Sequence, residues 1–259
     1  MSRHLLVIGA QRCGTTYLYR VLDEHPQIAM ARPARPEPKF FCDPELWRRG
    51  LDWYEATYFS GRADVPVHGE KSTSYIESAA AARRAAAMLP EADVLVMLRD
   101  PVARAISNWR FSTASGLEER PLEQALIENL QGARSWDPAR TSVSPFAYVE
   151  RGRYIDYLPS WRDRFGERLH VLFVEELARN PDAVMRLYKA LGVDPGYQPA
   201  ALRRRVNAAR ASAPQGTGDL GAALRASFAD SDRRLREWIG RPLPWDATRR
   251  DGGNSTANA

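Results

Sequence analysis

Two glycines near the start of the chain have the spacing of a phosphate-binding loop. Gly9 and Gly14 lie in the stretch GAQRCGTT, which follows the first part of the pattern G-x-x-x-x-G-K-[ST]. Thr15 stands where nucleotide hydrolases have a lysine that reaches between the β- and γ-phosphates, and Arg12 supplies the positive charge instead. Backbone amides at the start of a helix, helped by the hydroxyls of Thr15 and Thr16, can bind an anion. The missing lysine disfavours a triphosphate–magnesium site and favours a different phosphoanhydride, with a structural strand–turn–helix corner as the alternative.

A second candidate group lies in the stretch LRDPVARAISNW, which begins at residue 98. Arg99 ends an apolar run, where a charged side chain is unfavourable unless it faces a site. Ser107 follows eight residues later, and we predict that it shares a helix face with Asp100 and Arg104. A guanidinium at a strand end and a hydroxyl on the next helix can bind one phosphate together. A capped surface helix with a solvated arginine is the alternative.

Apolar runs rich in branched residues precede both stretches and predict buried strands of a parallel sheet. The first run is HLLVIGA, the second covers Val94–Leu98, and a third covers Leu169–Val174. Strands that alternate with helices predict an α/β fold, a parallel sheet flanked by helices. Ligands of such sheets bind at the carboxyl ends of the strands. We therefore expect residues 9–16, Lys71 and Arg99 to lie near one another.

A helix is predicted after each of the three strands. The first ends at His25 and Pro26, the second begins at Asp100 as N-cap with Pro101 in the first turn, and the third runs from Asn180 to Gly192. Their apolar stripes are Tyr17, Leu18, Val21 and Leu22; Val102, Ile106 and Trp109; and Val184, Leu187, Tyr188 and Leu191.

The remaining segments are less regular. Three prolines make ARPARPEPKFF extended or turning. Within residues 110–150 we predict one helix, Pro121–Leu130, and otherwise loop. Residues 203–219 are expected to be mobile and residues 246–259 to form a disordered tail, so that a single domain covers residues 1–245.

Composition limits the class of protein. Of 259 residues, 44% are hydrophobic and 27% charged, as in soluble globular proteins. The net charge of +5 suits an anionic ligand but is too small to indicate a nucleic-acid partner. No signal peptide is recognisable, and no apolar run approaches the ~20 residues of a membrane helix. We expect a soluble, cytoplasmic protein without a membrane partner. Its two cysteines do not form a disulfide framework. The sequence leaves the oligomeric state open.

Taken together, GAQRCGTT and RDPVARAIS resemble the cofactor signature of sulfotransferases that use 3′-phosphoadenosine 5′-phosphosulfate (PAPS). EPKFF, GLDWY, GEKSTSYI and the long segment from RGRYIDYLPSW to YKALGV are similar, in order, to the heparan sulfate N- and O-sulfotransferase branch. The resemblance covers residues 4–193 and rests on the order and spacing of the motifs. It implies the P-loop-like sulfotransferase fold, PAPS as donor and adenosine 3′,5′-bisphosphate as product.

The resemblance also assigns the nucleotide-binding positions. In the family the first loop binds the 5′-phosphosulfate, which implicates Arg12, Cys13, Gly14, Thr15 and Thr16. Arg12 stands where the family usually has lysine. The positive charge is kept, but a planar guanidinium replaces the compact ammonium group. Arg99 and Ser107 match the pair that binds the 3′-phosphate. Asn207 and Arg210 fall, with a poor match, where the family has a loop over the nucleotide.

Glu37 and Lys71 match the catalytic positions. Glu37 corresponds to the general base of the O-sulfotransferase members, and Lys71 to a lysine near the transferring sulfuryl group; Lys39 stands where this branch often has histidine. A carboxylate can take the acceptor's proton, while Lys71 and Arg12 neutralise charge that develops on oxygens. Without the resemblance, Glu37 reads as a solvated charge in a proline-rich loop. The scheme needs no metal.

Four histidines, His4, His25, His68 and His170, are scattered through the sequence and predict no metal-ligand cluster. His25 reads as a helix-end residue, whereas His68, three residues before Lys71, is the alternative base.

The acceptor is the least determined part of the prediction. Five aromatic residues can line an acceptor pocket or belong to the core: Trp53, Tyr54, Phe111, Trp136 and Phe146. Arg32 and Arg35 near Glu37 would suit a glycan. We expect the acceptor group to be a hydroxyl of a small molecule or carbohydrate, with an amine as the alternative. A P-loop kinase of small molecules and a non-catalytic nucleotide-binding protein are the alternatives; Thr15 argues against the first and the pair Glu37 and Lys71 against the second.

Overall fold

The computed structural model describes residues 2–137, 141, 143–180, 182–202 and 218–246. The chain divides into two compact units. The first unit consists of Met1–Leu98 and Tyr157–Ala213, and the second of Arg99–Asp156 and Pro214–Ala259. Each unit is therefore built from two separate stretches of chain. Among the described residues, no helix combines the length and apolar character needed to cross a membrane.

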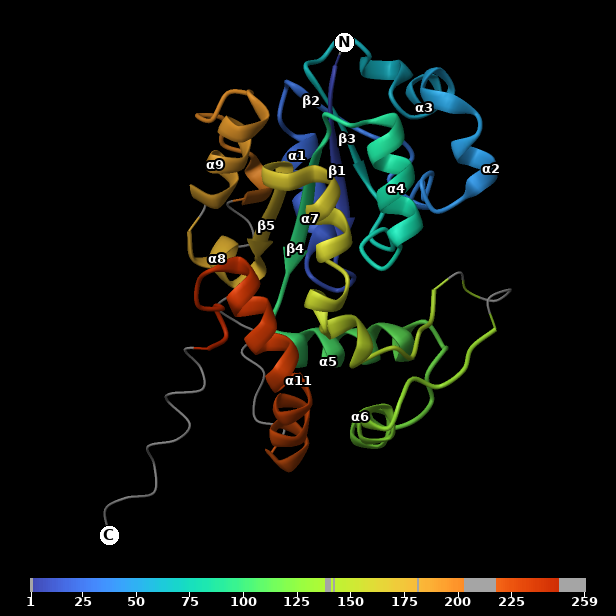
Figure 1. Ribbon diagram of the computed structural model, residues 1–259, viewed down its shortest axis with the longest axis vertical. Coiled ribbons are helices and arrows are strands. Elements are labelled where there is room, and N and C mark those ends of the chain that lie inside the picture. Colours follow the sequence, from blue (N-terminus) through green and yellow to red (C-terminus); the bar gives the residue numbers. More distant parts are fainter. Residues whose placement is uncertain (1, 138–140, 142, 181, 203–217, 247–259) are drawn as a thin grey trace. The chain divides into compact units, whose positions relative to one another are not determined.

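Five parallel strands of the described chain form the sheet of the first unit (Figure 1). They are β1 (Arg3–Gly9), β2 (Ile28–Met30), β3 (Val67–Lys71), β4 (Asp93–Leu98) and β5 (Leu169–Phe173). The order across the sheet is β2-β3-β1-β4-β5, so β1 is central and pairs with β3 and β4. This confirms the predicted parallel sheet flanked by helices. The strand expected to end at Val174 ends at Phe173, because Val174 begins a helix.

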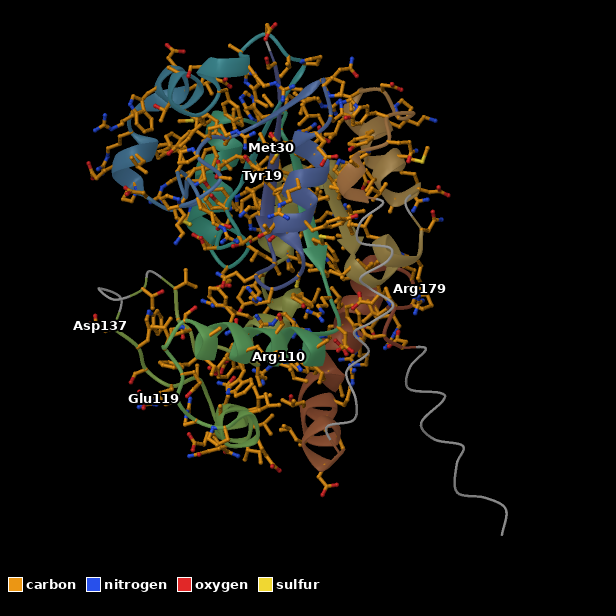
Figure 2. The ribbon with its side chains drawn as sticks, turned by 180° about the vertical axis from the view of Figure 1, so that it is seen from behind. Tyr19, Met30, Arg110, Glu119, Asp137 and Arg179 are labelled. Carbon is orange, nitrogen blue, oxygen red and sulfur yellow. The ribbon has the colours of Figure 1, made fainter. Side chains whose placement is uncertain are left out.

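Helices cover both faces of this sheet, and residues 5–9 of β1 and all of β3 and β4 are buried. In Figure 1, α4 (Ala79–Met88) and α7 (Pro159–Phe165) lie in front of the sheet, and Figure 2 shows α1 (Thr15–Asp23) on the opposite face. On the α1 face, Leu5 and Val7 belong to one core cluster with residues of α1 and of α9 (Asp182–Leu191). The predicted stripe of α9 is buried, as expected.

Smaller elements complete the first unit. They are α2 (Pro44–Trp47), α3 (Gly50–Tyr58), α8 (Val174–Arg179) and the 3₁₀ helices η1 (Ser60–Arg62) and η4 (Gly166–Arg168). Helix α1 ends at Asp23, two residues before the predicted end at His25, which is buried. The Nε2 of His25 lies 3.0 Å from the carbonyl of Asp194, so it is a core residue at the helix end.

The second unit is helical in its described residues. It contains α5 (Pro101–Ala114), α6 (Leu122–Leu130), α11 (Gly218–Ile239) and the 3₁₀ helices η2 (Glu150–Gly152) and η3 (Tyr154–Asp156). Its core joins α5, α6 and α11 through residues such as Ile106, Leu126 and Phe228.

Several expectations for this unit need correction. The helix predicted near residues 121–130 is confirmed as α6, but α5 extends to Ala114 into the stretch expected to be loop. Gly218 and Asp219, expected to be mobile, begin α11, a 22-residue helix that the sequence reading missed. Asp246, the first residue of the predicted tail, accepts hydrogen bonds of 2.9 and 2.8 Å from Arg236. Residues 203–217 and 247–259 lie outside the described residues.

Candidate active site

The loop between β1 and α1 has a backbone suited to an anion. A Cβ atom at Gly9 would lie 2.8 Å from Cγ2 of Ile76, so only glycine fits this position. Gly14 has a φ of 77°, a left-handed conformation that favours glycine, and as N-cap of α1 it supplies no side-chain oxygen. The first amides of α1, those of Thr15 and Thr16, have no acceptor within the helix. They are therefore available to an anionic ligand.

The other loop residues contribute in different ways. Arg12 is half-buried, with a φ of 67° that is uncommon for a residue with a side chain. Cys13 is buried, and its Sγ lies 3.6 Å from the carbonyl of Gln11, so that it can offer only its backbone to a ligand. Thr15 is buried and Thr16 exposed. The geometry suits the predicted phosphate cradle, while each contact to a ligand stays a prediction.

Glu37 and Lys71 meet at the same edge of the sheet. Lys71 ends β3 in register with Val7, and the next amide, of Ser72, donates to the carbonyl of Val7 at 3.1 Å. The Nζ of Lys71 donates to Oε1 of Glu37. Oε2 of Glu37 accepts two hydrogen bonds from Thr73, at 2.8 Å from the amide and 2.9 Å from the hydroxyl. Only 5% of the Lys71 side chain and 19% of that of Glu37 is exposed, so the pair is partly shielded from water.

The segment that carries Glu37 is fixed to the core. Phe40 and Phe41 are fully buried, as expected for anchors of this loop. The amide of Lys39 donates to Oγ of Ser72 at 2.8 Å, and the amide of Phe41 to the hydroxyl of Tyr75 at 3.0 Å. The backbone just after Glu37 is thus anchored by two hydrogen bonds, and the carboxylate itself is held by Lys71 and Thr73.

A buried carboxylate, Glu70, supports this segment and was missed by the sequence reading. Its Oε1 accepts from the hydroxyl of Ser72 at 2.5 Å, and its Oε2 from the hydroxyl of Tyr54 at 3.0 Å. Burial raises the pKa of Glu70 to about 7, although hydrogen bonds from Ser72, Tyr75 and Tyr54 act in the opposite direction. Ser72 therefore links Glu70 to the amide of Lys39. In the stretch GEKS, only the lysine was predicted to be functional. A glutamate inside a buried strand is itself unusual, and it could have identified Glu70.

The predicted 3′-phosphate pair belongs to the second unit. Arg99 directly follows β4, is half-buried, and its carbonyl accepts from the hydroxyl of Tyr154 at 2.8 Å. Ser107 is half-buried on α5. Asp100 caps α5 as predicted, accepting from the amide of Val102 at 2.9 Å. The expected proximity of Arg99 to the phosphate loop stays a prediction, and Asn207 and Arg210 lie outside the described residues.

Arg104, predicted to share a helix face with Ser107, has its charge inside the second unit. It is fully buried, and its Nη2 donates to the carbonyls of Ala147 and Tyr148 at 3.2 and 2.5 Å. A buried guanidinium needs acceptors for its N–H groups, and these carbonyls accept from its Nη2. A second arginine, Arg225 of α11, instead forms a two-pronged ion pair with the Asp100 carboxylate.

The side chains considered for base and acceptor roles are dispersed. His68 lies at the amino-terminal end of β3, where its Nδ1 is 2.6 Å from Glu55, so it is not part of the Glu37 group. Tyr54 is fully buried and belongs to the core. Arg32 pairs with Asp23 at 2.6 Å, and Arg35 is exposed. Half of Phe111 is exposed, and Trp53 is half-buried beside Phe40.

Trp136 and Phe146 do line a pocket, in the second unit. Its volume is ≈ 330 Å³, within the usual size of ligand pockets. The wall also includes Glu119 and Asp137, labelled in Figure 2, and Arg134, whose Cζ lies 5.5 Å from the centre of the Phe146 ring. Aromatic faces beside charged groups of both signs suit a polar organic ligand better than a purely apolar one.

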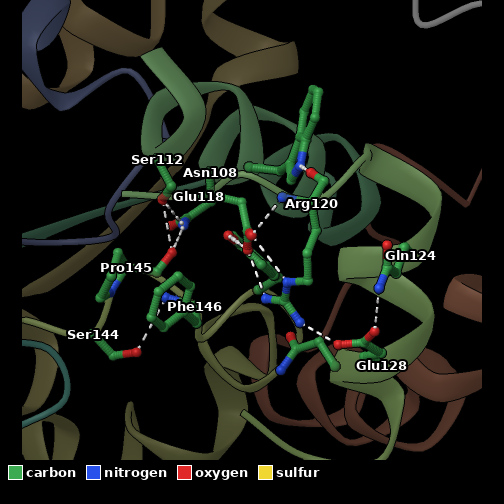
Figure 3. Close-up of polar contacts among 12 residues, drawn as sticks. Asn108, Ser112, Glu118, Arg120, Gln124, Glu128, Ser144, Pro145 and Phe146 are labelled. Carbon is green, nitrogen blue, oxygen red and sulfur yellow. Dashed lines mark hydrogen bonds and ion pairs between the residues drawn. The ribbon is translucent and has the colours of Figure 1, made fainter. Parts of the chain in front are cut away.

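A hydrogen-bond network supports this pocket wall (Figure 3). The hydroxyl of Ser112 donates to the carbonyl of Pro145 at 2.7 Å. Buried Glu118 accepts from Arg120, at 2.9 and 2.6 Å, and from the hydroxyl of Tyr148 at 2.8 Å. Burial by itself raises the pKa of Glu118, but hydrogen bonds from Arg120 and Tyr148 outweigh it and lower the pKa to about 2.

Replacing Glu118 with glutamine is expected to lower the free energy of unfolding by about 1.5–3 kcal/mol at neutral pH, the usual contribution of hydrogen bonds to a charged group. A pKa of about 2, against the ordinary 4.5, means that the carboxylate stabilises the fold above pH 4.5. That contribution is lost as the pH falls from 4.5 towards 2. Urea unfolding of both proteins at pH 7, 4 and 3 should show the difference shrinking. Exposed Glu119 provides the control, Glu119→Gln; a difference that stays constant down to pH 3 would argue against the ionic role of Glu118.

Comparison with known proteins agrees with this geometry. A family model described as the sulfotransferase domain matches residues 2–210. A crystal structure of a sulfotransferase from Alicyclobacillus acidocaldarius is similar, with a TM-score of 0.76 and 26% identity over 94% of this chain and 98% of that one. The sulfotransferase domain of the curacin biosynthetic pathway, at 12% identity and a TM-score of 0.53, shares the fold. The predicted P-loop-like sulfotransferase fold is confirmed.

Curated relatives bear out the predicted branch. The bovine (Bos taurus) bifunctional heparan sulfate N-deacetylase/N-sulfotransferase 2 is 30% identical over 73% of this chain, and the human (Homo sapiens) bifunctional heparan sulfate N-deacetylase/N-sulfotransferase 3 is 32% identical over 74%. This chain spans 22% of the length of each of these relatives. The similarity is therefore to one portion of much longer proteins.

Proposed function

Because the chain belongs to the sulfotransferase family, we propose that it transfers a sulfuryl group from PAPS to a hydroxyl of a carbohydrate or small-molecule acceptor. The observation that carries this proposal is the contact between Glu37 and Lys71 at the sheet edge that also bears the phosphate loop. A carboxylate and an ammonium group in contact supply both a proton acceptor and a positive charge for developing oxyanions. Neither is required of a protein that merely binds a nucleotide.

The residues that would hold the donor fit its chemistry. The uncapped amides at the start of α1 and the guanidinium of Arg12 suit the 5′-phosphosulfate. Arg99 and Ser107 offer a charged fork and a hydroxyl to the 3′-phosphate. When bound, PAPS supplies a sulfuryl group attached to a phosphate that serves as leaving group.

Within the chain, the geometry distinguishes the two oxygens of Glu37. Oε2 accepts two hydrogen bonds from Thr73, and these occupy both lone pairs of Oε2. Oε1 accepts one hydrogen bond, from Nζ of Lys71. We therefore assign Oε1 as the atom that takes the proton of the acceptor hydroxyl. As the acceptor oxygen forms its bond to sulfur and the bond from sulfur to the leaving phosphate breaks, Lys71 neutralises charge on the nearby oxygens.

The acceptor assignment draws on the relatives and on the pocket of the second unit. Relatives are named for heparan sulfate, which supports a carbohydrate. They are also named N-sulfotransferases, so an amine is the alternative to a hydroxyl, and Glu37 can serve either. Within the second unit, the pocket lined by Trp136 and Phe146 offers aromatic faces of the kind that bind sugar rings and similar polar bodies through their apolar surfaces.

Thermal unfolding with different nucleotides tests the donor. Adenosine 3′,5′-bisphosphate is expected to stabilise the protein by about 2.7 kcal/mol at 100 times its dissociation constant. ATP with magnesium should stabilise it much less at the same concentration. Stabilisation by ATP–magnesium without stabilisation by the bisphosphate would support a kinase instead.

One variant makes the same experiment specific. Arg99→Ala should weaken the bisphosphate about 10–150-fold, since hydrogen bonds to charged groups contribute about 1.5–3 kcal/mol. Binding of adenosine 5′-monophosphate, which lacks the 3′-phosphate, should hardly change. Arg110→Ala, at an exposed arginine of α5 (Figure 2), is the matched control. Equal losses for both nucleotides, by calorimetry, would mean that Arg99 has only a structural role.

A further inference from the structure

Two histidines that are far apart in sequence lie side by side at the amino-terminal end of the sheet. His4 of β1 and His68 of β3 are register partners in a parallel pair, so their side chains leave the same face of the sheet. Their ring centres are 6.0 Å apart, with the planes nearly perpendicular at 83°. Nothing in the spacing of the histidines predicts this grouping.

A carboxylate from a third element reaches both rings. Glu55 of α3 contacts Nε2 of His4 through Oε1, and Nδ1 of His68 through Oε2 at 2.6 Å. One donor atom from each of the three residues lies within 4.8 Å of the other two. Three ligands of a tetrahedral zinc ion, bound at about 2.0–2.2 Å, are roughly 3.4 Å from one another. Small side-chain rotations therefore bring the three donors to the separations that such an ion requires.

The surroundings fit a three-ligand site with one open position. The His68 ring is 3% exposed and stacks on Phe59, with ring centres 4.5 Å apart and planes 6° from parallel, which fixes its orientation. Among the described residues nothing forms a hydrogen bond to Nε2 of His68. No described partner at Nε2 therefore fixes the tautomer, and the Nδ1 lone pair faces a metal whenever Nε2 carries the proton. His4 and Glu55 are 13% and 28% exposed, so water can enter as a fourth ligand.

We propose that His4, Glu55 and His68 bind a divalent transition-metal ion, with Zn²⁺ the best match to two imidazoles and one carboxylate. The site lies away from the phosphate loop, because His4 and Gly9 are five positions apart along an extended strand, about 16 Å. Its role is structural: the ion ties α3 to two strands of the sheet. The reaction proposed above does not depend on it.

Calorimetric titration of the full chain with Zn²⁺, after treatment with a chelator, tests this site. We expect one ion per chain and a rise in unfolding temperature on loading. His4→Gln and Glu55→Gln should each weaken Zn²⁺ binding by at least about tenfold, since even indirect partners of a metal site contribute 10–100-fold. His170→Gln is the matched control: its Nε2 lies 2.8 Å from Asp93, in a histidine–carboxylate pair to which no described residue adds a third metal ligand. Equal affinity in the two site variants and the control would overturn the proposal.

X-ray absorption of the zinc-loaded wild-type protein gives a result that does not depend on how the variants fold. We expect nitrogen and oxygen ligands at about 2.0–2.2 Å, with the outer scattering of two imidazoles. A sulfur ligand at about 2.3 Å would place the ion at a cysteine and contradict the site. Failure to bind Zn²⁺ at all would mean that the three residues form only a hydrogen-bonded group, and it would leave the sulfotransferase proposal untouched.

Discussion

Glu37→Gln is expected to lower turnover by about 10²–10⁴-fold, the range for loss of one general base. Glutamine keeps the size of the side chain and can still accept from Thr73, but it cannot take a proton from the acceptor. Affinity for adenosine 3′,5′-bisphosphate should barely change, because Glu37 is not among the proposed phosphate contacts. Steady-state kinetics with PAPS, paired with calorimetry for the bisphosphate, separates the two effects.

Glu45→Gln is the control for this variant. Glu45 is an exposed glutamate of α2 whose carboxylate pairs with Arg48, and its replacement should leave turnover at the wild-type level. If Glu37→Gln retained more than about a tenth of wild-type turnover, it would lie outside the range for a general base. The proton acceptor would then be another group, and His68 is a poor substitute because it faces Glu55 at the other end of β3.

Lys71→Met should reduce turnover by about 10²–10³-fold, the usual effect of removing one group that stabilises developing charge. Methionine has a similar length and occupies the buried position without the ammonium group. The loss should appear in kcat more than in KM, since the charge is proposed to act on oxygens that gain negative charge during transfer. Folding is checked by circular dichroism, because the change also removes the partner of Glu37.

Lys189→Met is the matched control, since Lys189 is an exposed lysine of α9 in the same unit. It removes one lysine charge from the protein without touching the sheet edge. If the Lys71 and Lys189 variants had the same kcat, the contact between Lys71 and Glu37 would be structural only. A loss confined to KM would place Lys71 in ground-state binding of the donor.

Elements with strong local signals could be predicted from the sequence, whereas α11 could not. Leu5–Ile8 of β1 form an uninterrupted apolar run because both faces of the strand are buried there, and Gly14 marks the turn into α1. Helix α11 was missed although Leu220, Leu224 and Phe228 recur every fourth residue and are buried. Glycine, alanine, arginine and serine fill the positions between them, so the apolar stripe is narrow and weak as a sequence signal. It is recognisable as a core stripe only when α5 and α6 are seen to pack against it.

Long-range pairings explain why the site was only partly predictable. Glu37 and Lys71 are 34 residues apart, and their contact depends on how the strand ending at Lys71 aligns with β1; only the family resemblance pointed to both. Helical spacing placed Arg104 on the face of Ser107, but the carbonyls that bury its guanidinium are 43 and 44 residues away. The meeting of His4 with His68 likewise depends on strand register, which single residues do not encode.

Because both compact units are built from two stretches of chain, neither is encoded by one uninterrupted piece of a gene. During synthesis the sheet lacks its edge strand β5 until Phe173 has been made, and the helical unit lacks α11 until the ribosome nears the end of the described chain. Synthesis of the second unit thus begins before that of the first unit has finished. Consecutive domains, in contrast, are synthesised and can fold one after the other. A single crossover between related genes would cut through at least one of them, so descendants are expected to inherit the two units together.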